Sequence, residues 1–195
     1  DGIASKVTID ICGGTVYSHA SDDAINSASN MTITGGCVYA QSTGNDGLDA
    51  NGNIYLKGGV VYAIGTTSPE VGIDANTEGG YKLYLTGGTI IAIGGIESGS
   101  SISQALVTSS SWTKSSEYSL MNGTTPIVSF KTPDAGGTSL VISSASLTSG
   151  SSYTLKSGVT ISGGTTYFNA VTFDGSVSGG TGTTVTASTT YSGGG

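Results

Sequence analysis

A pair of adjacent glycines recurs through the first half of the chain, and its spacing constrains the fold more than any other feature. From residue 13 to 35, 35 to 58 and 58 to 87, the steps between pairs are 22, 23 and 29 residues. Internal repeats of about 20 to 50 residues are typical of solenoids, propellers and arrays, in which each repeat is one structural unit. The spacing therefore predicts a repeat protein, with the pairs at Gly13–Gly14, Gly35–Gly36, Gly58–Gly59 and Gly87–Gly88.

The segments on either side of each pair alternate between apolar and other residues. Before the pairs stand IDIC, MTIT, IYLK and LYLT, and after them stand TVYS, CVYA, VVYA and TIIA. A period of two is typical of a strand with one buried face, and a glycine pair lets the backbone bend between two short strands without a Cβ clash. We expect one set of side chains to point inward: Ile9, Ile11, Val16, Met31, Ile33, Val38, Ile54, Leu56, Val61, Leu83, Leu85 and Ile90.

A repeat of about 22 residues cannot bury its apolar face alone, but stacked repeats bury a continuous core. Because no helical period is present, the pattern predicts an all-β parallel β-helix over residues 1–100. A propeller or a β-sandwich would need longer blades or hairpin-linked strands, which the 22 to 23 residue spacing disfavours. After residue 100 the period is lost, so we expect residues 101–195 to form a β-rich region that caps or continues the solenoid, with a flexible glycine-rich tail.

The composition excludes some classes of partner. A net charge of −7, with six lysines and no arginine, argues against nucleic acid, because phosphate binding needs clustered basic residues. No run of about 18 apolar residues is present, so we expect no membrane span. The Ser-, Thr-, Gly- and Asn-rich chain suits a secreted bacterial protein at the cell surface. Cys12 and Cys37 occupy non-equivalent repeat positions, which leaves open whether they pair or stay as separate thiols.

A phrase rich in aspartate and asparagine also repeats. It reads NDGLDANGN at 45–53, EVGIDAN at 70–76 and, more weakly, DDAINSA at 22–28, with a degenerate copy DGIASK at the start. Equivalent positions of stacked coils lie about 4.8 Å apart. One predicted column therefore holds Asp1, Asp23, Asp46 and Val71, and a second holds Ala4, Asn26, Asp49 and Asp74.

These columns favour a bound cation. Two carboxylates about 5 Å apart repel by roughly 3 kcal/mol at an effective dielectric of ~20. Calcium takes carboxylate and amide oxygens, and the absence of histidine and cysteine from the phrases argues against zinc or copper. The alternative is ordinary turn chemistry, in which Asp and Asn side chains bond nearby backbone amides. The calcium prediction names Asp23, Asn26, Asp46, Asp49 and Asp74.

Tyrosines form two further columns. Tyr17, Tyr39 and Tyr62 each follow an inward valine, so alternation turns them outward, and Tyr55 and Tyr84 occupy a second outward column. A row of exposed aromatic rings beside carboxylates and amides suits a carbohydrate, whose rings have apolar CH faces and polar hydroxyls. The alternative is a structural ladder of cross-strand aromatic pairs, each worth about 0.2–1 kcal/mol.

Catalysis has weak support in the sequence. β-Helices host polysaccharide lyases and glycosidases, but fold alone does not determine function. A lyase usually takes a proton with an arginine or lysine, and Lys6 is the one lysine within an aspartate column. Asp22 with Asp23, or Asp46 with Asp49, could form a hydrolase pair, although the repeat already explains them. The single histidine, His19, is expected at the surface.

The repeats also resemble a known family. DGLDANGNIYLKGGVVYAIG (46–65), VGIDANTEGGYKLYLTGGTIIAIGG (71–95) and SLVISSASLTSGSSYTLKSGVTISGG (139–164) are similar to secreted bacterial carbohydrate-binding-domain proteins with a polysaccharide-lyase-like, right-handed parallel β-helix. The resemblance implies calcium between coils and binding to plant cell-wall polysaccharide, including acidic pectin-like chains. Asp46, Asp49 and Asp74 match the aspartates of the family phrase, whereas Asp23 and Asn26 match less well because Ala24 replaces a glycine.

Three functions follow as hypotheses. The first is a non-catalytic extracellular module that binds an acidic pectin-like or a cellulose-like polysaccharide on a calcium-stabilised β-helix. The second is an adhesive or structural surface protein whose coils associate end to end into a fibre, because an unsealed β-helix end is a pairing surface. The third, and the least supported, is a polysaccharide lyase or glycosidase.

Overall fold

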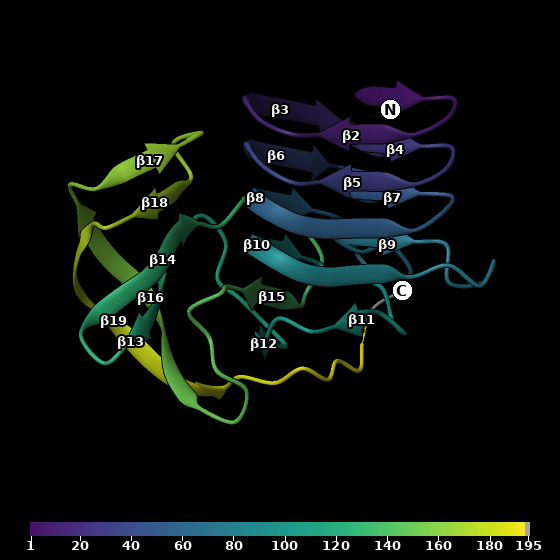
Figure 1. The fold of residues 1–195 in the computed structure, drawn as a ribbon. Coiled ribbons are helices and arrows are strands. Elements are labelled where there is room, and N and C mark those ends of the chain that lie inside the picture. Colours follow the sequence, from purple (N-terminus) through teal and green to yellow (C-terminus); the bar gives the residue numbers. More distant parts are fainter. Residues whose placement is uncertain (194–195) are drawn as a thin grey trace.

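The computed structural model describes residues 1–193, and all their regular secondary structure is β-strand (Figure 1). Stacked parallel coils form a β-solenoid of about three turns, as the glycine spacing predicts. Within the described residues, no helix is long and apolar enough to cross a membrane. The solenoid occupies the first half of the chain, and its strands are β1 (Ile3–Ser5), β2 (Ile9–Ile11), β3 (Thr15–Ala20), β4 (Ile25–Ser27), β5 (Met31–Ile33), β6 (Cys37–Ser42), β7 (Leu48–Ala50), β8 (Ile54–Ile64), β9 (Ile73–Ala75) and β10 (Leu83–Ile93).

Two parallel sheets make the walls of the solenoid. One has the order β1-β4-β7-β9, and the other contains β2, β5, β8 and β10, with β3 and β6 continuing the same wall beyond the glycine bend. The register matches the predicted columns: Asn26 pairs with Asp49, which pairs with Asp74, and Tyr17 pairs with Tyr39, which pairs with Tyr62. A side chain therefore lies directly over its equivalent in the next coil.

The glycine pairs bend each coil as predicted. The second glycine of every pair has a left-handed φ, from +78° at Gly14 to +85° at Gly88. Stacking adds a second constraint, because a Cβ on Gly36 would lie 2.7 Å from the backbone carbon of Gly13. Glycine therefore serves both the turn and the close approach of neighbouring coils.

The predicted inward side chains form the core of the solenoid. Nine of them are fully buried in one cluster, and Ile9, Ile11 and Val16 of the first coil are partly buried against it. Those three belong to the end coil, above which no further described strand lies. The apolar alternation thus predicted the core residues correctly. The three side chains of the first coil are incompletely buried because no described coil covers them on one side.

Part of residues 101–193 closes the other end of the solenoid. β11 (Ser101–Ile102) pairs with β10 in parallel, and β15 (Leu140–Ser143) pairs antiparallel with both β10 and β12 (Leu106–Ser109). The C-terminal segment returns beneath this end, where Tyr191 packs against the core (Figure 1). The glycine-rich tail predicted to be flexible therefore begins with an anchored tyrosine, and its last residues, 194 and 195, lie outside the described residues.

The rest of the second half forms a separate six-stranded sheet in the order β17-β18-β14-β13-β16-β19. All of its pairings are antiparallel. It lies beside the solenoid (Figure 1), and its core is shared with the outer face of the coils, since Tyr62, Ile91 and Phe130 belong to one cluster. Its strands are β13 (Glu117–Asn122), β14 (Thr125–Lys131), β16 (Ser152–Ser162), β17 (Thr165–Tyr167), β18 (Val171–Phe173) and β19 (Ser176–Thr186).

Candidate functional site

The outer face of the wall formed by β5, β8 and β10 carries a stacked pair of tyrosines. Tyr55 and Tyr84 are adjacent in register, with ring centroids 5.2 Å apart and planes 8° apart. Each ring turns one face toward the other, and the next positions in the column are the small residues Thr32 and Ser101. Both rings are half-buried, and the column places no bulky side chain against their outer faces.

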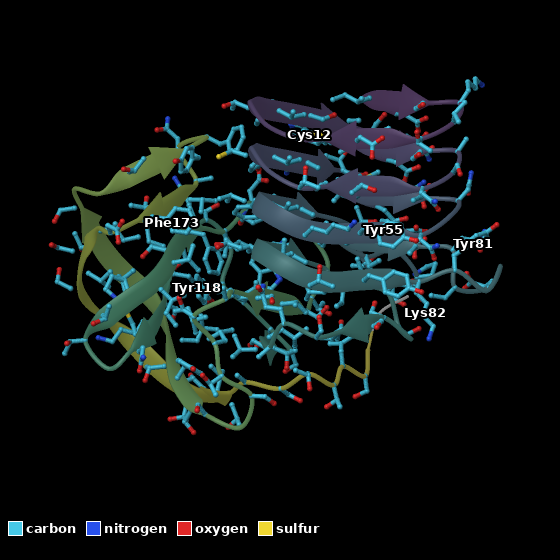
Figure 2. All side chains as sticks on the ribbon, viewed as in Figure 1. Cys12, Tyr55, Tyr81, Lys82, Tyr118 and Phe173 are labelled. Carbon is cyan, nitrogen blue, oxygen red and sulfur yellow. The ribbon has the colours of Figure 1, made fainter. Side chains whose placement is uncertain are left out.

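Cations and amides surround this pair. The Nζ of Lys57 lies 5.4 Å from the Tyr55 ring centroid, and the Asn53 amide donates to the Tyr55 hydroxyl at 3.0 Å. Tyr81 and Lys82 are exposed beside the pair (Figure 2). Within residues 1–193 the one salt bridge joins the N-terminal amine to Asp22, so these lysines are free of carboxylate partners. The face thus combines aromatic rings with unpaired positive charge in a protein of net charge −7.

The second predicted row is mostly covered. Tyr17 is 59% exposed, Tyr39 is half-buried and Tyr62 is fully buried. Tyr62 packs edge-on against Phe130 of the six-stranded sheet and donates its hydroxyl to the Lys131 carbonyl at 2.7 Å. The prediction that Tyr62 lies on an exposed platform is therefore wrong. Alternation does turn it out of the solenoid, but the second sheet occupies the space outside.

Only the end of that row remains open. Tyr17 stacks on Tyr39 with centroids 4.9 Å apart, and Phe168 leans against both rings. Phe168 and Asn169 are consecutive residues with φ of +57° and +52°, and the Ala170 amide donates to the Tyr167 carbonyl. Two positive φ values in such a turn normally call for Asn or Gly, so the turn holds a phenylalanine in an unfavourable backbone state that is offset by ring packing.

The repeated aspartates converge on the corner of the solenoid beside β7 and β9. One carboxylate oxygen from each of Asp46, Asp49 and Asp74 lies within 4.8 Å of the others. Asp46 is buried and accepts from the Val71 amide at the start of the next coil. No lysine pairs with these groups among the described residues. The cluster therefore brings together carboxylate oxygens that could ligate a cation, and no cationic side chain balances their negative charge.

Burial makes these carboxyls hard to ionise. It raises the pKa of Asp49 to about 6, and the charge of Asp23 adds to the effect. Burial also raises the pKa values of Asp46 and Asp74 above their ordinary range, and a hydrogen bond with Glu97 contributes at Asp74. A divalent cation would favour the ionised forms of the same groups. Oxygen-only donors at this spacing fit calcium, which takes six to eight oxygens.

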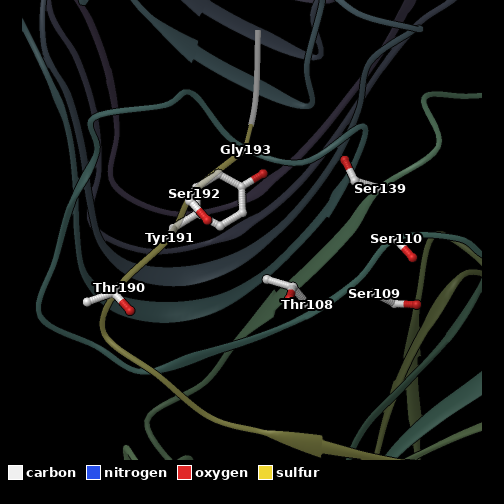
Figure 3. A pocket seen from close by; sticks show the side chains of 8 residues that line it. All are labelled: Thr108, Ser109, Ser110, Ser139, Thr190, Tyr191, Ser192 and Gly193. Atoms are coloured by element: carbon white, nitrogen blue, oxygen red, sulfur yellow. The ribbon is translucent and has the colours of Figure 1, made fainter.

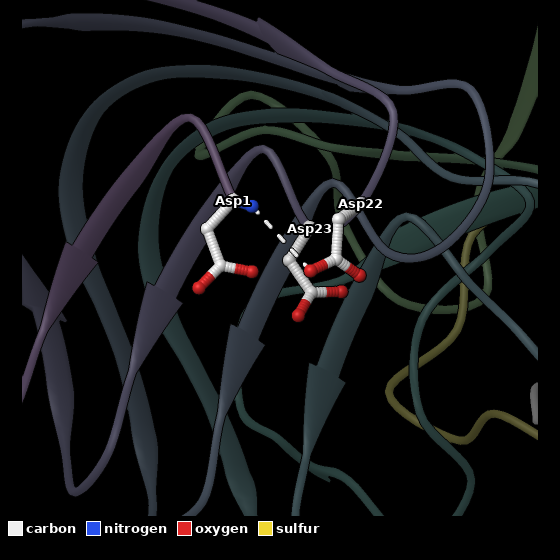
Figure 4. A group of neighbouring side chains, drawn as sticks. All are labelled: Asp1, Asp22 and Asp23. Carbon is white, nitrogen blue, oxygen red and sulfur yellow. Dashed lines mark hydrogen bonds and ion pairs between the residues drawn. The ribbon is translucent and has the colours of Figure 1, made fainter.

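Two predicted ligands play a different part in this structure. The Asn26 amide nitrogen donates to Asp23 at 2.8 Å and to Asp49 at 2.7 Å, so a neutral amide bridges the two carboxylates. Asp23 also accepts from the Asp46 amide at 3.2 Å. Asp23 belongs to a second acidic group with Asp1 and Asp22 (Figure 4). The five predicted ligands thus divide into an Asp46–Asp49–Asp74 cluster and an outer pair, Asp23 and Asn26.

One member of the acidic column escaped the sequence prediction. Glu97 is buried beside Asp74, because Ile73 pairs with Ile96 and places the two acids in register. Its carboxylate accepts from the Thr77 and Ser98 hydroxyls, both at 3.0 Å. The signal was present in GIES at 95–98, which is a copy of GIDA at 72–75 with glutamate in place of aspartate.

Comparisons with protein-family models, with curated proteins and with solved structures find no significant match. Of the family resemblance, the structure supports the stacked-coil architecture. Cys12 and Cys37 are free thiols, and His19 is exposed as predicted.

Proposed function

We propose that the protein is a secreted, non-catalytic module that binds polysaccharide on the outer face of its solenoid. The observation that carries the proposal is the Tyr55–Tyr84 stack, whose outer faces adjoin small residues. Sugar CH groups pack on such faces, and the Asn53 amide and neighbouring hydroxyls can bond the sugar hydroxyls. The unpaired Lys57 and Lys82 favour an acidic, pectin-like chain over a neutral, cellulose-like one, because a carboxylated sugar would supply their missing partner.

Calcium is part of the proposal as a staple between coils. Asp46, Asp49 and Asp74 would hold the ion, with Glu97 beside them, and the ion would neutralise their repulsion. Because Asp46 and Asp49 belong to one coil and Asp74 to the next, a bound ion would hold neighbouring coils together. The residues themselves keep the corner ordered through the Asp46–Val71 and Asn26–Asp49 hydrogen bonds.

Polysaccharide pull-down tests the binding site. Tyr84→Ala should weaken retention on insoluble polygalacturonate, while the free energy of unfolding falls by at most about 1 kcal/mol, the value of an exposed cross-strand aromatic pair. A central aromatic contact is worth more than that in binding. Tyr17→Ala is the matched control from the other row. If Tyr17→Ala reduces retention and Tyr84→Ala does not, the ligand lies at the end of the solenoid instead.

Self-association is the second candidate function, and the open end of the solenoid favours it. β1 and β3 have a strand neighbour on one side only, and the apolar side chains of Ile3 and Val7 are 39% and 66% exposed there. The other end is closed by β12, β15 and Tyr191. Among the described residues only this end is open, so two copies of these residues would meet head to head as a closed pair, whereas a fibre would need a second open end.

Sedimentation measurements test this candidate. The wild type should sediment as a dimer, and Val7→Glu should return it to a monomer, because a carboxylate would be buried between the two ends. Thr124→Glu, in the exposed turn between β13 and β14 of the six-stranded sheet, is the control and should remain dimeric. A monomeric wild type would remove the candidate.

A further inference from the structure

Three adjoining hollows lie where the closing segments meet the solenoid, away from the Tyr55–Tyr84 face. The first is lined by Trp112 and Lys114 and has a volume of about 120 Å³. The second, of about 180 Å³, is lined by Ser68 and Glu70, and the two share Gly137 and Thr138. The third, of about 280 Å³, continues past Ser139 to the C-terminal segment (Figure 3). Together they form one groove around residues 137–139.

The indole of Trp112 is held in a fixed position at one end of this groove. Its Nε1 donates to the Gly137 carbonyl at 2.7 Å, and the next residue, Thr113, donates its amide to the Tyr118 hydroxyl at 2.8 Å. Part of the ring packs against the core shared by the two halves of the molecule. A Cβ on Gly136 would lie 3.2 Å from the indole and 2.6 Å from Ile93, so the groove wall approaches the ring only because residue 136 is glycine.

Four polar side chains along the groove have no partner within residues 1–193, whereas the Thr66 hydroxyl beside them donates to the Asn45 carbonyl. Ser68, Thr138 and Ser139 make no side-chain hydrogen bond there, and the Glu70 carboxylate has neither a hydrogen bond nor a salt bridge. The hydroxyls offer donors and acceptors, and the carboxylate offers acceptors. A rigid aromatic ring with a few uncommitted polar groups around a hollow is the usual composition of a small-molecule site.

We propose that this groove is a second saccharide site. One sugar ring packs on Trp112, and its hydroxyls, or those of the next ring, bond Glu70, Ser68 and Thr138. The groove carries one unpaired carboxylate, Glu70, and one unpaired ammonium, Lys114, so it has no net charge and takes neutral sugars, whereas the Tyr55–Tyr84 face has unpaired lysines only. The ligand class rests on the proposed function, but the site and its preference for uncharged sugars are new. Two sites on different faces would let one molecule bridge two chains or two parts of one chain.

Fluorescence can follow this site directly, because Trp112 is the single tryptophan of the chain. Titration with cellohexaose should change the Trp112 emission saturably in the wild type and in Tyr84→Ala. Thr138→Phe should weaken that response more than about tenfold, since the new ring fills the space shared by two hollows without touching the core. Thr124→Phe, an exposed position in the turn between β13 and β14, is the matched control and should respond like the wild type.

The outcomes separate the two proposals. If polygalacturonate binds through Tyr84 but cellohexaose leaves the emission of the wild type unchanged, the groove is no site and the proposed function stands. If Thr138→Phe responds like the wild type, the groove assignment is wrong as well. If neither saccharide binds in calorimetry or pull-down, both proposals fail.

Discussion

Tyr17 and Tyr62 occupy one column of the solenoid, yet their surroundings are opposite. Tyr17 is 59% exposed at the open end, whereas Tyr62 is fully buried and bonded to Lys131. We expect Tyr62→Ala to lower the free energy of unfolding by about 3–5 kcal/mol, the range for removing a buried aromatic ring. Tyr17→Ala should cost at most about 1 kcal/mol. Urea unfolding of both variants measures this, and equal losses would contradict the burial of Tyr62 beneath the second sheet.

Asp74 has two effects that oppose each other, and calcium decides which prevails. In excess chelator, the folded state must either keep the Asp74 carboxyl protonated, since burial raises its pKa, or bear its repulsion by the neighbouring carboxylates. Asp74→Asn removes that cost and should raise the free energy of unfolding by up to about 3 kcal/mol, the repulsion of two charges about 5 Å apart at a dielectric of ~20. In calcium, the same variant should lose most of the stabilisation that the ion provides to the wild type. Melting curves with and without calcium test both parts. A variant that melts like the wild type in chelator would show that repulsion at this corner is negligible.

At the scale of the strand and its bend, two reasons for glycine can be distinguished. One is the left-handed backbone of the turn, and the other is the close approach of the neighbouring coil. Gly14 and Gly36 have nearly the same φ, +78° and +81°. A Cβ at Gly14 meets no atom within 4 Å, whereas one at Gly36 would lie 2.7 Å from the coil above. Gly14→Ala should therefore cost only the left-handed backbone, about 1–2 kcal/mol, and Gly36→Ala should cost clearly more. Equal losses in chemical denaturation would mean that the coils are not in close contact at the bend.

At the scale of the whole molecule, the acidic corner links stability to pH. Burial raises the pKa of Asp49 from 3.8 to about 6, so between these values the folded state binds more protons than the unfolded state. Stability without calcium should then be greatest below about pH 4 and fall as the pH rises through about 6. Bound calcium replaces the proton, so the stabilisation by calcium should grow over the same window.

Melting temperatures in chelator and in calcium, from about pH 4 to about pH 8, test this linkage. Asp49→Asn is the control, because it removes one of the titrating groups while leaving the rest of the protein unchanged. The difference in melting temperature between wild type and variant should change with pH over the window described above. If calcium stabilises the wild type equally at all pH values, the ion does not bind at these carboxylates.

The fold of the solenoid half could be predicted from the sequence, because residues that stack in adjacent coils are separated by a nearly constant number of residues. With coils stacked at a period of 22 to 23 residues, alternation alone identifies inward residues such as Leu56, and the same offset places Asp49 over Asn26. Glu97 follows the same spacing: GIES at 95–98 is a fifth copy of the phrase, and recognising it would have placed Glu97 in the acidic column. These predictions needed only local geometry and counting.

Residues 101–193 have no such offset, so the sequence did not indicate their division into a closing segment and a six-stranded sheet. Their antiparallel pairings join strands at irregular separations, such as β14 with β18. Of the closing strands, β11 and β12 precede the sheet in the chain, whereas β15 lies between its strands β14 and β16. Periodicity cannot show which of several β-rich segments will pair when loop lengths vary. One part of this region closes the solenoid, and the other forms a sheet of its own.

The sequence by itself determined the coil, its inward face and the order of the columns, because each depends on a period of two within a strand and a fixed offset between strands. Only the tertiary structure decided which outward residues meet solvent. Alternation gives Tyr55 and Tyr62 the same outward direction, but the six-stranded sheet packs over Tyr62 and buries it fully, whereas Tyr55 is only half-buried. The direction of a side chain is a local property of its strand. Its exposure depends on which distant parts of the chain pack against that strand, and this packing is driven by the total apolar area removed from water.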